Sequence, residues 1–196
     1  VLGKQKNMLL HKHLKLYLID QDGVLADFET GFLEIWEKVC PEEYKDKLKD
    51  RQSYFLEDSF PEEMRQEIIS VYYQKEFFKK LKPIPGSIEA VKLIESRGHE
   101  IMLCTAPLKY AGHSLSEKHE WIEKHLGKKY TKKVTYAYDK TIVGGDMLID
   151  DRPDITGLRE VPIWEHIVYD TSYNRHLTEN KRIRWDMDNW QEVLGI

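Results

Sequence analysis

Two carboxylates stand two residues apart where an apolar segment of the sequence ends. Asp20 and Asp22 follow the segment 14–19, and Gly23 after them favours a turn. Because alternate side chains of a strand share a face, both acids can reach one site at the strand's carboxyl end. A carboxylate pair there can hold a hard cation and supply both a nucleophile and a proton donor, as phosphoryl transfer requires. An Asp-x-Asp pair alone is nevertheless a weak signal.

Other polar groups follow further apolar segments. Thr105 closes the segment 99–105, Lys140 follows a third segment, and Asp150 with Asp151 ends a fourth. The Thr hydroxyl and the amides after it can bind phosphate oxygens, and the Lys ammonium offers a positive charge. Adjacent acids on a strand point to opposite faces, so one can ligate a metal while the other orients its surroundings. Singly, these residues also fit a turn threonine, a solvated lysine and an exposed acidic turn.

The order of these residues favours one site over coincidence. Asp-x-Asp, Thr, Lys and Asp-Asp each come directly after an expected strand. A two-component receiver domain also uses Asp, Thr and Lys on a parallel sheet. In that fold the acidic pair precedes the phosphorylated Asp and no large helical insertion follows the first strand, so the order here excludes it.

Short apolar runs alternate with helical patterns along most of the chain. Such runs are typical of strands buried on both faces, and the alternation predicts a Rossmann-like parallel α/β sheet flanked by helices. Pro85 opens one helical pattern and Gly98 closes it, Ser114 with Glu117 forms a capping box for a second, and Asp188 can cap a third. The expected strands are 14–20, 99–105, 133–138, 147–150 and 166–169.

One stretch breaks this alternation. Between the first two expected strands lie far more residues than one crossover needs. Residues 29–40, 41–50 and 61–80 have helical spacing of apolar side chains. We therefore expect a helical cap insertion over residues 29–82, above the two aspartates. The α/β core then comprises residues 14–28 and 83–196, after an N-terminal extension of residues 1–13.

The motifs together carry a family resemblance. The chain resembles the haloacid dehalogenase (HAD)-like superfamily of phosphotransferases, whose four signature motifs match in order, and more closely the 5′(3′)-deoxyribonucleotidase family. The resemblance covers roughly residues 14–194. Its motifs are Asp20-Gln21-Asp22-Gly23-Val24-Leu25-Ala26-Asp27-Phe28, Cys104-Thr105-Ala106-Pro107, Asp139-Lys140-Thr141, Leu148-Ile149-Asp150-Asp151-Arg152-Pro153-Asp154-Ile155-Thr156-Gly157 and Trp164-Glu165-His166.

The resemblance implies a mechanism and a metal. Asp20 would attack phosphorus, and Asp22 would protonate the leaving group and then activate water. Mg²⁺ would be held by the Asp20 carboxylate, the Asp22 backbone carbonyl and Asp151, with Asp150 in a supporting position. The phosphate would contact Thr105, Ala106 and Lys140. Ala106 stands where many relatives have Ser, so only its amide can bind phosphate.

The resemblance also implies a nucleotide substrate. The base and sugar would lie in the cap, and a deoxy preference requires an apolar wall beside the 2′ position. A phosphatase acting on another small phosphate ester, and a catalytically idle binding module, are the alternatives. The residues expected to line the nucleotide pocket are Phe28, Tyr54, Phe55, Leu56 and Tyr72. Without the resemblance, we would interpret these side chains as the hydrophobic core of the cap.

Composition limits the partners and the compartment. The chain has 196 residues with 41% apolar side chains, and its formal net charge of −4 disfavours a nucleic-acid partner. No apolar run is long enough for a membrane span, Cys40 and Cys104 do not suggest a disulfide framework, and a cytoplasmic location follows as the default. The basic run 181–184 is expected to be solvated surface, and His11 with His13 a flexible extension. Relatives are often homodimers, but no hydrophobic stripe decides the oligomeric state.

Overall fold

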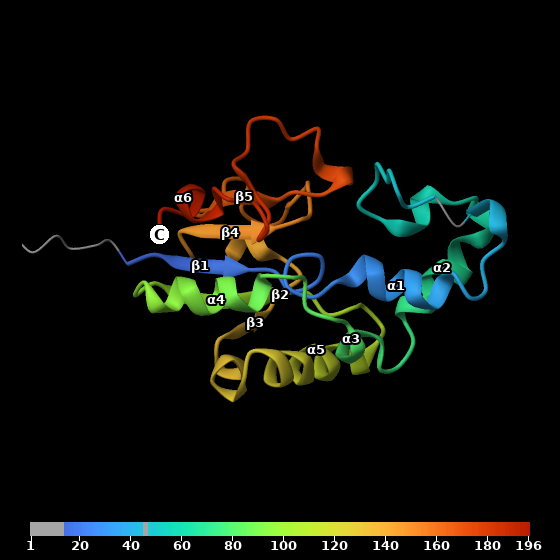
Figure 1. Ribbon diagram of the computed structural model, residues 1–196, viewed down its shortest axis with the longest axis horizontal. Helices are drawn as coiled ribbons and strands as arrows, with labels where there is room; N and C mark the ends of the chain where they lie inside the picture. Colours follow the sequence, from blue (N-terminus) through green and yellow to red (C-terminus); the bar gives the residue numbers. More distant parts are fainter. Residues whose placement is uncertain (1–13, 45–46) are drawn as a thin grey trace, which may run out of the picture.

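A parallel β-sheet forms the centre of the computed structural model, which describes residues 14–44 and 47–196 (Figure 1). Within these ranges the strand order is β3-β2-β1-β4-β5-β6, and each neighbouring pair is parallel. The five expected strands are confirmed to within two residues at each end. The strands are β1 (Leu16–Ile19), β2 (Glu100–Thr105), β3 (Val134–Tyr136), β4 (Met147–Asp150), β5 (Glu165–Tyr169) and β6 (Arg182–Ile183).

The α-helices of the core pack on one face of this sheet: α4 (Ser87–Ser96), α5 (Gly112–His125) and α6 (Trp190–Leu194) all contribute side chains to the larger apolar cluster. The described side chains of the smaller cluster, on the other face, come from strands and from the loops between them. Short 3₁₀ turns complete the core: η4 (Lys128–Lys132), η5 (Lys140–Ile142) and η6 (Ser172–Asn174). Strand β1 is buried on both faces of the sheet, because Tyr17 and Ile19 pack into the larger apolar cluster and Leu18 packs into the smaller one. None of the described helices is long and apolar enough to cross a membrane.

The segment between β1 and α4 contains short helices joined by longer irregular stretches, and it lies beyond the carboxyl ends of the strands (Figure 1). The helix expected over 29–40 is α1 and ends at Trp36. The expected helix over 41–50 was wrong, because its described part has only a 3₁₀ turn at residues 42–44. The pattern over 61–80 is interrupted at Glu76, whose φ is 70°. The elements are α1 (Phe28–Trp36), η1 (Glu42–Tyr44), η2 (Leu56–Ser59), η3 (Glu62–Met64), α2 (Arg65–Tyr72) and α3 (Phe77–Lys80).

The start of α5 differs from the expected capping box. The helix begins at Gly112, so Ser114 and Glu117 lie inside it. The Ser114 hydroxyl accepts a hydrogen bond from the amide of Leu108 at 2.9 Å, and the Glu117 carboxylate accepts one from the amide of Phe78 at 3.1 Å. Both side chains accept hydrogen bonds from residues outside the helix, which is why the capping-box pattern of the sequence was misleading.

The C-terminal region also corrects two expectations. No side-chain hydrogen bond caps α6, so the capping role expected for Asp188 was wrong. The basic run 181–184 contains the edge strand β6 instead of a fully solvated surface. Ile183 is buried, and Arg182 forms an ion pair with Asp170 at 2.5 Å. Residues 1–13, with the expected flexible extension, lie outside the described ranges.

Candidate active site

The loop after β1 is tightly folded around Asp20 and Asp22. The amide of Asp20 donates to the carbonyl of Ile149 at 2.9 Å, and the amide of Gly23 donates to the carbonyl of Ala26 at 2.9 Å. Gly23 has a φ of +76°, and a Cβ there would lie 2.3 Å from Oδ2 of Asp151. A glycine is therefore required, since it brings the loop against the aspartate that follows β4.

Lys140 joins the ends of β1 and β4. Its ammonium lies 2.8 Å from Oδ1 of Asp20 and 2.6 Å from Oδ2 of Asp150. The other Asp150 oxygen accepts a hydrogen bond from the amide of Arg152 at 2.9 Å, so both Asp150 oxygens are engaged. Trp164 donates to the Lys140 carbonyl at 3.1 Å and fixes the backbone that carries the lysine. Burial alone would lower the pKa of Lys140, but Asp150 and Asp20 raise it well above its usual value.

A divalent cation fits the charge of this cluster. Asp20, Asp150 and Asp151 are buried, and each offers an oxygen within 4.8 Å of the others. Burial raises the pKa of Asp20 to about 6, although Lys140 opposes the shift, and burial raises that of Asp151 well above its usual value. Oδ1 of Asp151 is buried without a hydrogen-bond partner in the described part of the chain. Three buried carboxylates supply hard oxygen ligands, which suit a divalent cation.

Lys118 ties the second aspartate to the end of β2. Its ammonium lies 2.6 Å from Oδ2 of Asp22 and 3.0 Å from the hydroxyl of Thr105. The same ammonium donates to the carbonyl of Ala106 at 2.5 Å. The Lys118 side chain is only 3% exposed, so its charge acts on Asp22 with little screening by water. The expected phosphate-binding residues of β2 thus lie beside the expected acid/base.

A cavity of about 490 Å³ extends from these residues to the helical segment between β1 and α4. On the side of the α/β core, the cavity is lined by Asp22, Ala106 and Asp151. The ring of Phe28 lies 5.6 Å from that of Tyr72, and the two rings are tilted against each other. The structure brings all the expected pocket side chains to this one cavity: Phe28, Tyr54, Phe55, Leu56 and Tyr72.

The comparisons with known proteins agree with this geometry. The sequence profile of the family described as "5' nucleotidase, deoxy (Pyrimidine), cytosolic type C protein" matches residues 15–196. The human cytosolic-type 5′(3′)-deoxyribonucleotidase is 37% identical over 185 residues, which cover 90% of this chain and 92% of the human protein. The chain belongs to the 5′(3′)-deoxyribonucleotidase family.

Relatives outside animals and solved structures extend this result. A Bordetella bronchiseptica protein assigned to the 5′(3′)-deoxyribonucleotidases is 41% identical over 180 residues, or 92% of this chain and 95% of that one. A haloacid dehalogenase-like hydrolase of Streptococcus pneumoniae has a TM-score of 0.59 at 14% identity, covering 93% of this chain and 97% of that one. This 5′(3′)-deoxyribonucleotidase family member is therefore a hydrolase with the HAD-like fold.

Sequence reasoning missed several polar residues of this family member's site. Lys118 shares a helix face with Trp121 and Ile122, and a lysine within an apolar stripe is a signal that could have been noticed. Glu57 lines the cavity with its carboxylate bound by the Tyr72 hydroxyl at 3.2 Å. No sequence signal marks Glu57, because its burial depends on α2. Arg51, Tyr173 and Asn174 were also missed.

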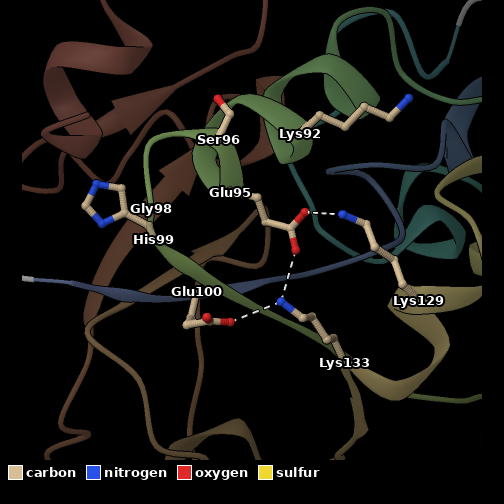
Figure 2. Close-up of a pocket in the computed structure, with 8 residues that line it drawn as sticks. All are labelled: Lys92, Glu95, Ser96, Gly98, His99, Glu100, Lys129 and Lys133. Carbon is tan, nitrogen blue, oxygen red and sulfur yellow. Dashed lines mark hydrogen bonds and ion pairs between the residues drawn. The ribbon is translucent and has the colours of Figure 1, made fainter.

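A second cavity, of about 410 Å³, lies at the amino end of β2, away from this family's motifs (Figure 2). Lys129 lies 2.6 Å from Oε2 of Glu95, and Lys133 lies 3.0 Å from both Glu95 and Glu100. Figure 2 shows these side chains pairing with one another across the cavity. These charges are thus paired within the protein.

Proposed function

We propose that this protein is a Mg²⁺-dependent phosphomonoesterase that dephosphorylates deoxyribonucleoside monophosphates through an aspartyl-phosphate. The observation that carries the proposal is the continuity between the acidic cluster and the cavity. Asp22 and Asp151 line the same cavity as Phe28 and Tyr54. Aromatic faces suit flat bases, and the carboxylates with Lys140 suit a phosphoryl group.

The first step transfers the phosphoryl group to Asp20. A carboxylate oxygen of Asp20 bonds to phosphorus while the ester bond to the nucleoside breaks. Asp22 gives its proton to the leaving alkoxide, and the nucleoside departs as an alcohol. The ammonium of Lys140, the hydroxyl of Thr105 and the amide of Ala106 hold the other phosphoryl oxygens.

The second step returns Asp20 to its starting state. Asp22, now a carboxylate, accepts a proton from a water molecule as the water oxygen bonds to phosphorus. The bond between phosphorus and the Asp20 oxygen breaks, and inorganic phosphate is released. Asp22 is suited to both steps because one carboxyl group can first donate and then accept the proton.

The metal would be held by the Asp20 carboxylate, the Asp22 backbone carbonyl and the Asp151 carboxylate. When bound, Mg²⁺ reduces the repulsion between an anionic nucleophile and an anionic phosphate. Asp150 serves as a support, since Lys140 and the amide of Arg152 already engage its two oxygens.

The substrate's nucleoside would lie under a cap of residues 29–82, with residues 14–28 and 83–196 as the core. Phe28, Phe55 and Tyr72 would enclose the base, and Tyr54 with Leu56 would flank it. An apolar wall beside the sugar would leave a 2′-hydroxyl without a partner, which would favour deoxyribonucleotides.

The test is phosphate release across matched deoxy- and ribonucleoside monophosphates, with sugar phosphates as a comparison. We expect Mg²⁺-dependent release, faster from dUMP or dTMP than from UMP by about 10-fold or more, as the cost of an unpaired buried hydroxyl implies. Equal rates for dUMP and UMP would contradict the deoxy preference. A higher rate on sugar phosphates than on nucleotides would favour a phosphatase that acts on another small phosphate ester. Inactivity on all the phosphate esters would favour a binding module without catalytic activity. Activity that persists in excess chelator would refute the Mg²⁺ requirement of the reaction.

A cytoplasmic location is part of the proposal. Cys104 is buried as a free thiol, which suits a reducing compartment, and the human relative is named a cytosolic type. The substrate is a small nucleotide, with neither a nucleic-acid polymer nor a membrane as partner. A homodimer is one of the oligomeric states open to this protein, since relatives are often dimers, and the molar mass in solution tests it.

A further inference from the structure

Two neighbouring residues of η6 form hydrogen bonds with Asp151. The hydroxyl of Tyr173 donates a hydrogen bond to Oδ2 of Asp151, and the side-chain amide of Asn174 donates to its backbone carbonyl at 2.8 Å. Both residues are buried. Because Oδ2 is engaged, the carboxylate is held with Oδ1 as the oxygen that has no partner in the described ranges. This is the arrangement of an oriented metal ligand.

A residue from the helical segment between β1 and α4 holds Tyr173 in turn. The guanidinium carbon of Arg51 lies 4.0 Å from the centre of the Tyr173 ring, and Arg51 is 5% exposed. Its guanidinium also donates to Oε2 of Glu29 at 2.8 Å and to the carbonyl of Tyr54 at 2.6 Å. A desolvated cation over an aromatic face is a favourable contact, so Arg51 constrains the position of the Tyr173 ring.

The aromatic ring of Tyr54 adds a second contact. It meets the Tyr173 ring edge to face at 5.9 Å, with 73° between the planes. Arg51, Tyr54, Tyr173 and Asp151 all line the 490 Å³ cavity. A continuous set of contacts thus runs from the nucleotide end of the cavity to the carboxylate that would bind the metal.

We propose that Tyr173 is a positioning residue that holds Asp151 ready for a divalent cation, and that Arg51 acts through Tyr173. The inference rests on the proposed function for the identity of Asp151 as a metal ligand. It adds that the segment between β1 and α4 supports the metal site as well as the base. Arg51 and Tyr173 touch neither the phosphoryl group nor the metal in this account.

The test is the dissociation constant of Mg²⁺ alone, measured by calorimetry on the full chain without nucleotide. We expect Tyr173→Phe to weaken Mg²⁺ binding by about 10-fold or more, as loss of a hydrogen bond to a metal ligand does. Tyr130→Phe is the matched control, because the buried Tyr130 hydroxyl donates to Glu95 at 2.7 Å, away from the aspartates. Its Mg²⁺ affinity should equal that of the wild type.

A double-mutant cycle separates positioning from general stability. Arg51→Met should weaken Mg²⁺ binding, whereas Arg65→Met, which removes ion pairs to Glu57 and Asp58, should not. Because Arg51 acts through the Tyr173 hydroxyl, the Arg51→Met loss should largely disappear in a Tyr173→Phe background. Unfolding midpoints without Mg²⁺ show whether each variant is folded.

The outcomes distinguish this inference from the proposed function. Unchanged Mg²⁺ affinity in folded Tyr173→Phe, with tight binding by the wild type, would overturn the positioning role alone. Additive losses in the cycle would overturn the role of Arg51 through Tyr173. A wild-type protein that does not bind Mg²⁺ would refute the metal site and this inference together.

Discussion

The ammonium of Lys118 lies 2.6 Å from Oδ2 of Asp22, so a buried cation from α5 sits beside the proposed acid/base. The same ammonium reaches the Thr105 hydroxyl, which links the loop after β1 to the end of β2. A fixed positive charge at this point can hold Asp22 and Thr105 in the geometry that both chemical steps need.

Removing this charge should slow the reaction. We expect Lys118→Met to lower kcat by about 10²- to 10³-fold, similar to the loss of one preorganised electrostatic contact, with a smaller loss for Lys118→Arg. Lys124→Met, at an exposed position of the same helix, is the control. Steady-state kinetics with dUMP measure the effect, and a Lys118→Met variant with wild-type kcat would show that this contact has no part in catalysis.

Truncating an aromatic side chain of the cavity should weaken substrate binding. Phe55 lines the cavity but is 50% exposed, so its removal should leave the fold intact. A base–aromatic contact is worth about 1–3 kcal/mol, and we expect Phe55→Ala to raise KM by about 10-fold or more with little change in kcat. Tyr110→Ala, at a fully exposed residue, is the control. An unchanged KM would remove Phe55 from the base pocket.

Glu95 should make stability depend on pH at the second cavity. Burial opposes its ionisation, but hydrogen bonds from Lys129, Tyr130 and Lys133 lower its pKa from 4.5 to about 2. A carboxylate with a lowered folded-state pKa stabilises the fold above pH 4.5 and loses that contribution as the pH falls toward 2.

The corresponding variant is Glu95→Gln. At pH 7 we expect a loss of about 1 kcal/mol and a fall in Tm of about 2–4 °C, which should shrink as the pH drops below 4.5. Glu89→Gln, at an exposed position of the same helix, should have little effect at any pH. Thermal unfolding between pH 7 and 3.5 measures both variants. A constant difference over that range would show that the Glu95 charge is not responsible.

The sheet was predictable because its strands carry the signal locally. β1 and β4 are apolar runs that end in aspartates, and the alternation with α4 and α5 fixes parallel pairing. The meeting of Asp20 and Asp150 follows from strand order, since β1 and β4 are neighbours. Lys140 comes from η5, after β3, which is separated from β1 by β2, so its contacts with both aspartates depend on the path of the chain between β3 and β4.

The missed features depend on contacts between distant segments. Ser114 and Glu117 have a capping pattern, but Leu108 and the amide of Phe78 bind them instead. Ile183 lies in a strand that pairs with β5 and packs into the larger apolar cluster, and a two-residue strand has too little pattern to detect. Local propensity is a weak guide wherever such tertiary partners compete with it.

The central claim is that Asp20 receives the phosphoryl group and Asp22 releases it. Asp22→Asn with p-nitrophenyl phosphate tests both roles, because a nitrophenolate leaves without a proton while hydrolysis of the phosphoenzyme still needs a base. We predict a rapid burst of one nitrophenolate per protein and a phosphate that mass spectrometry finds on Asp20, neither of which occurs in an Asp20→Asn, Asp22→Asn double variant. Absence of a burst and of phosphate on Asp20, or an equal burst in the double variant, would contradict the account.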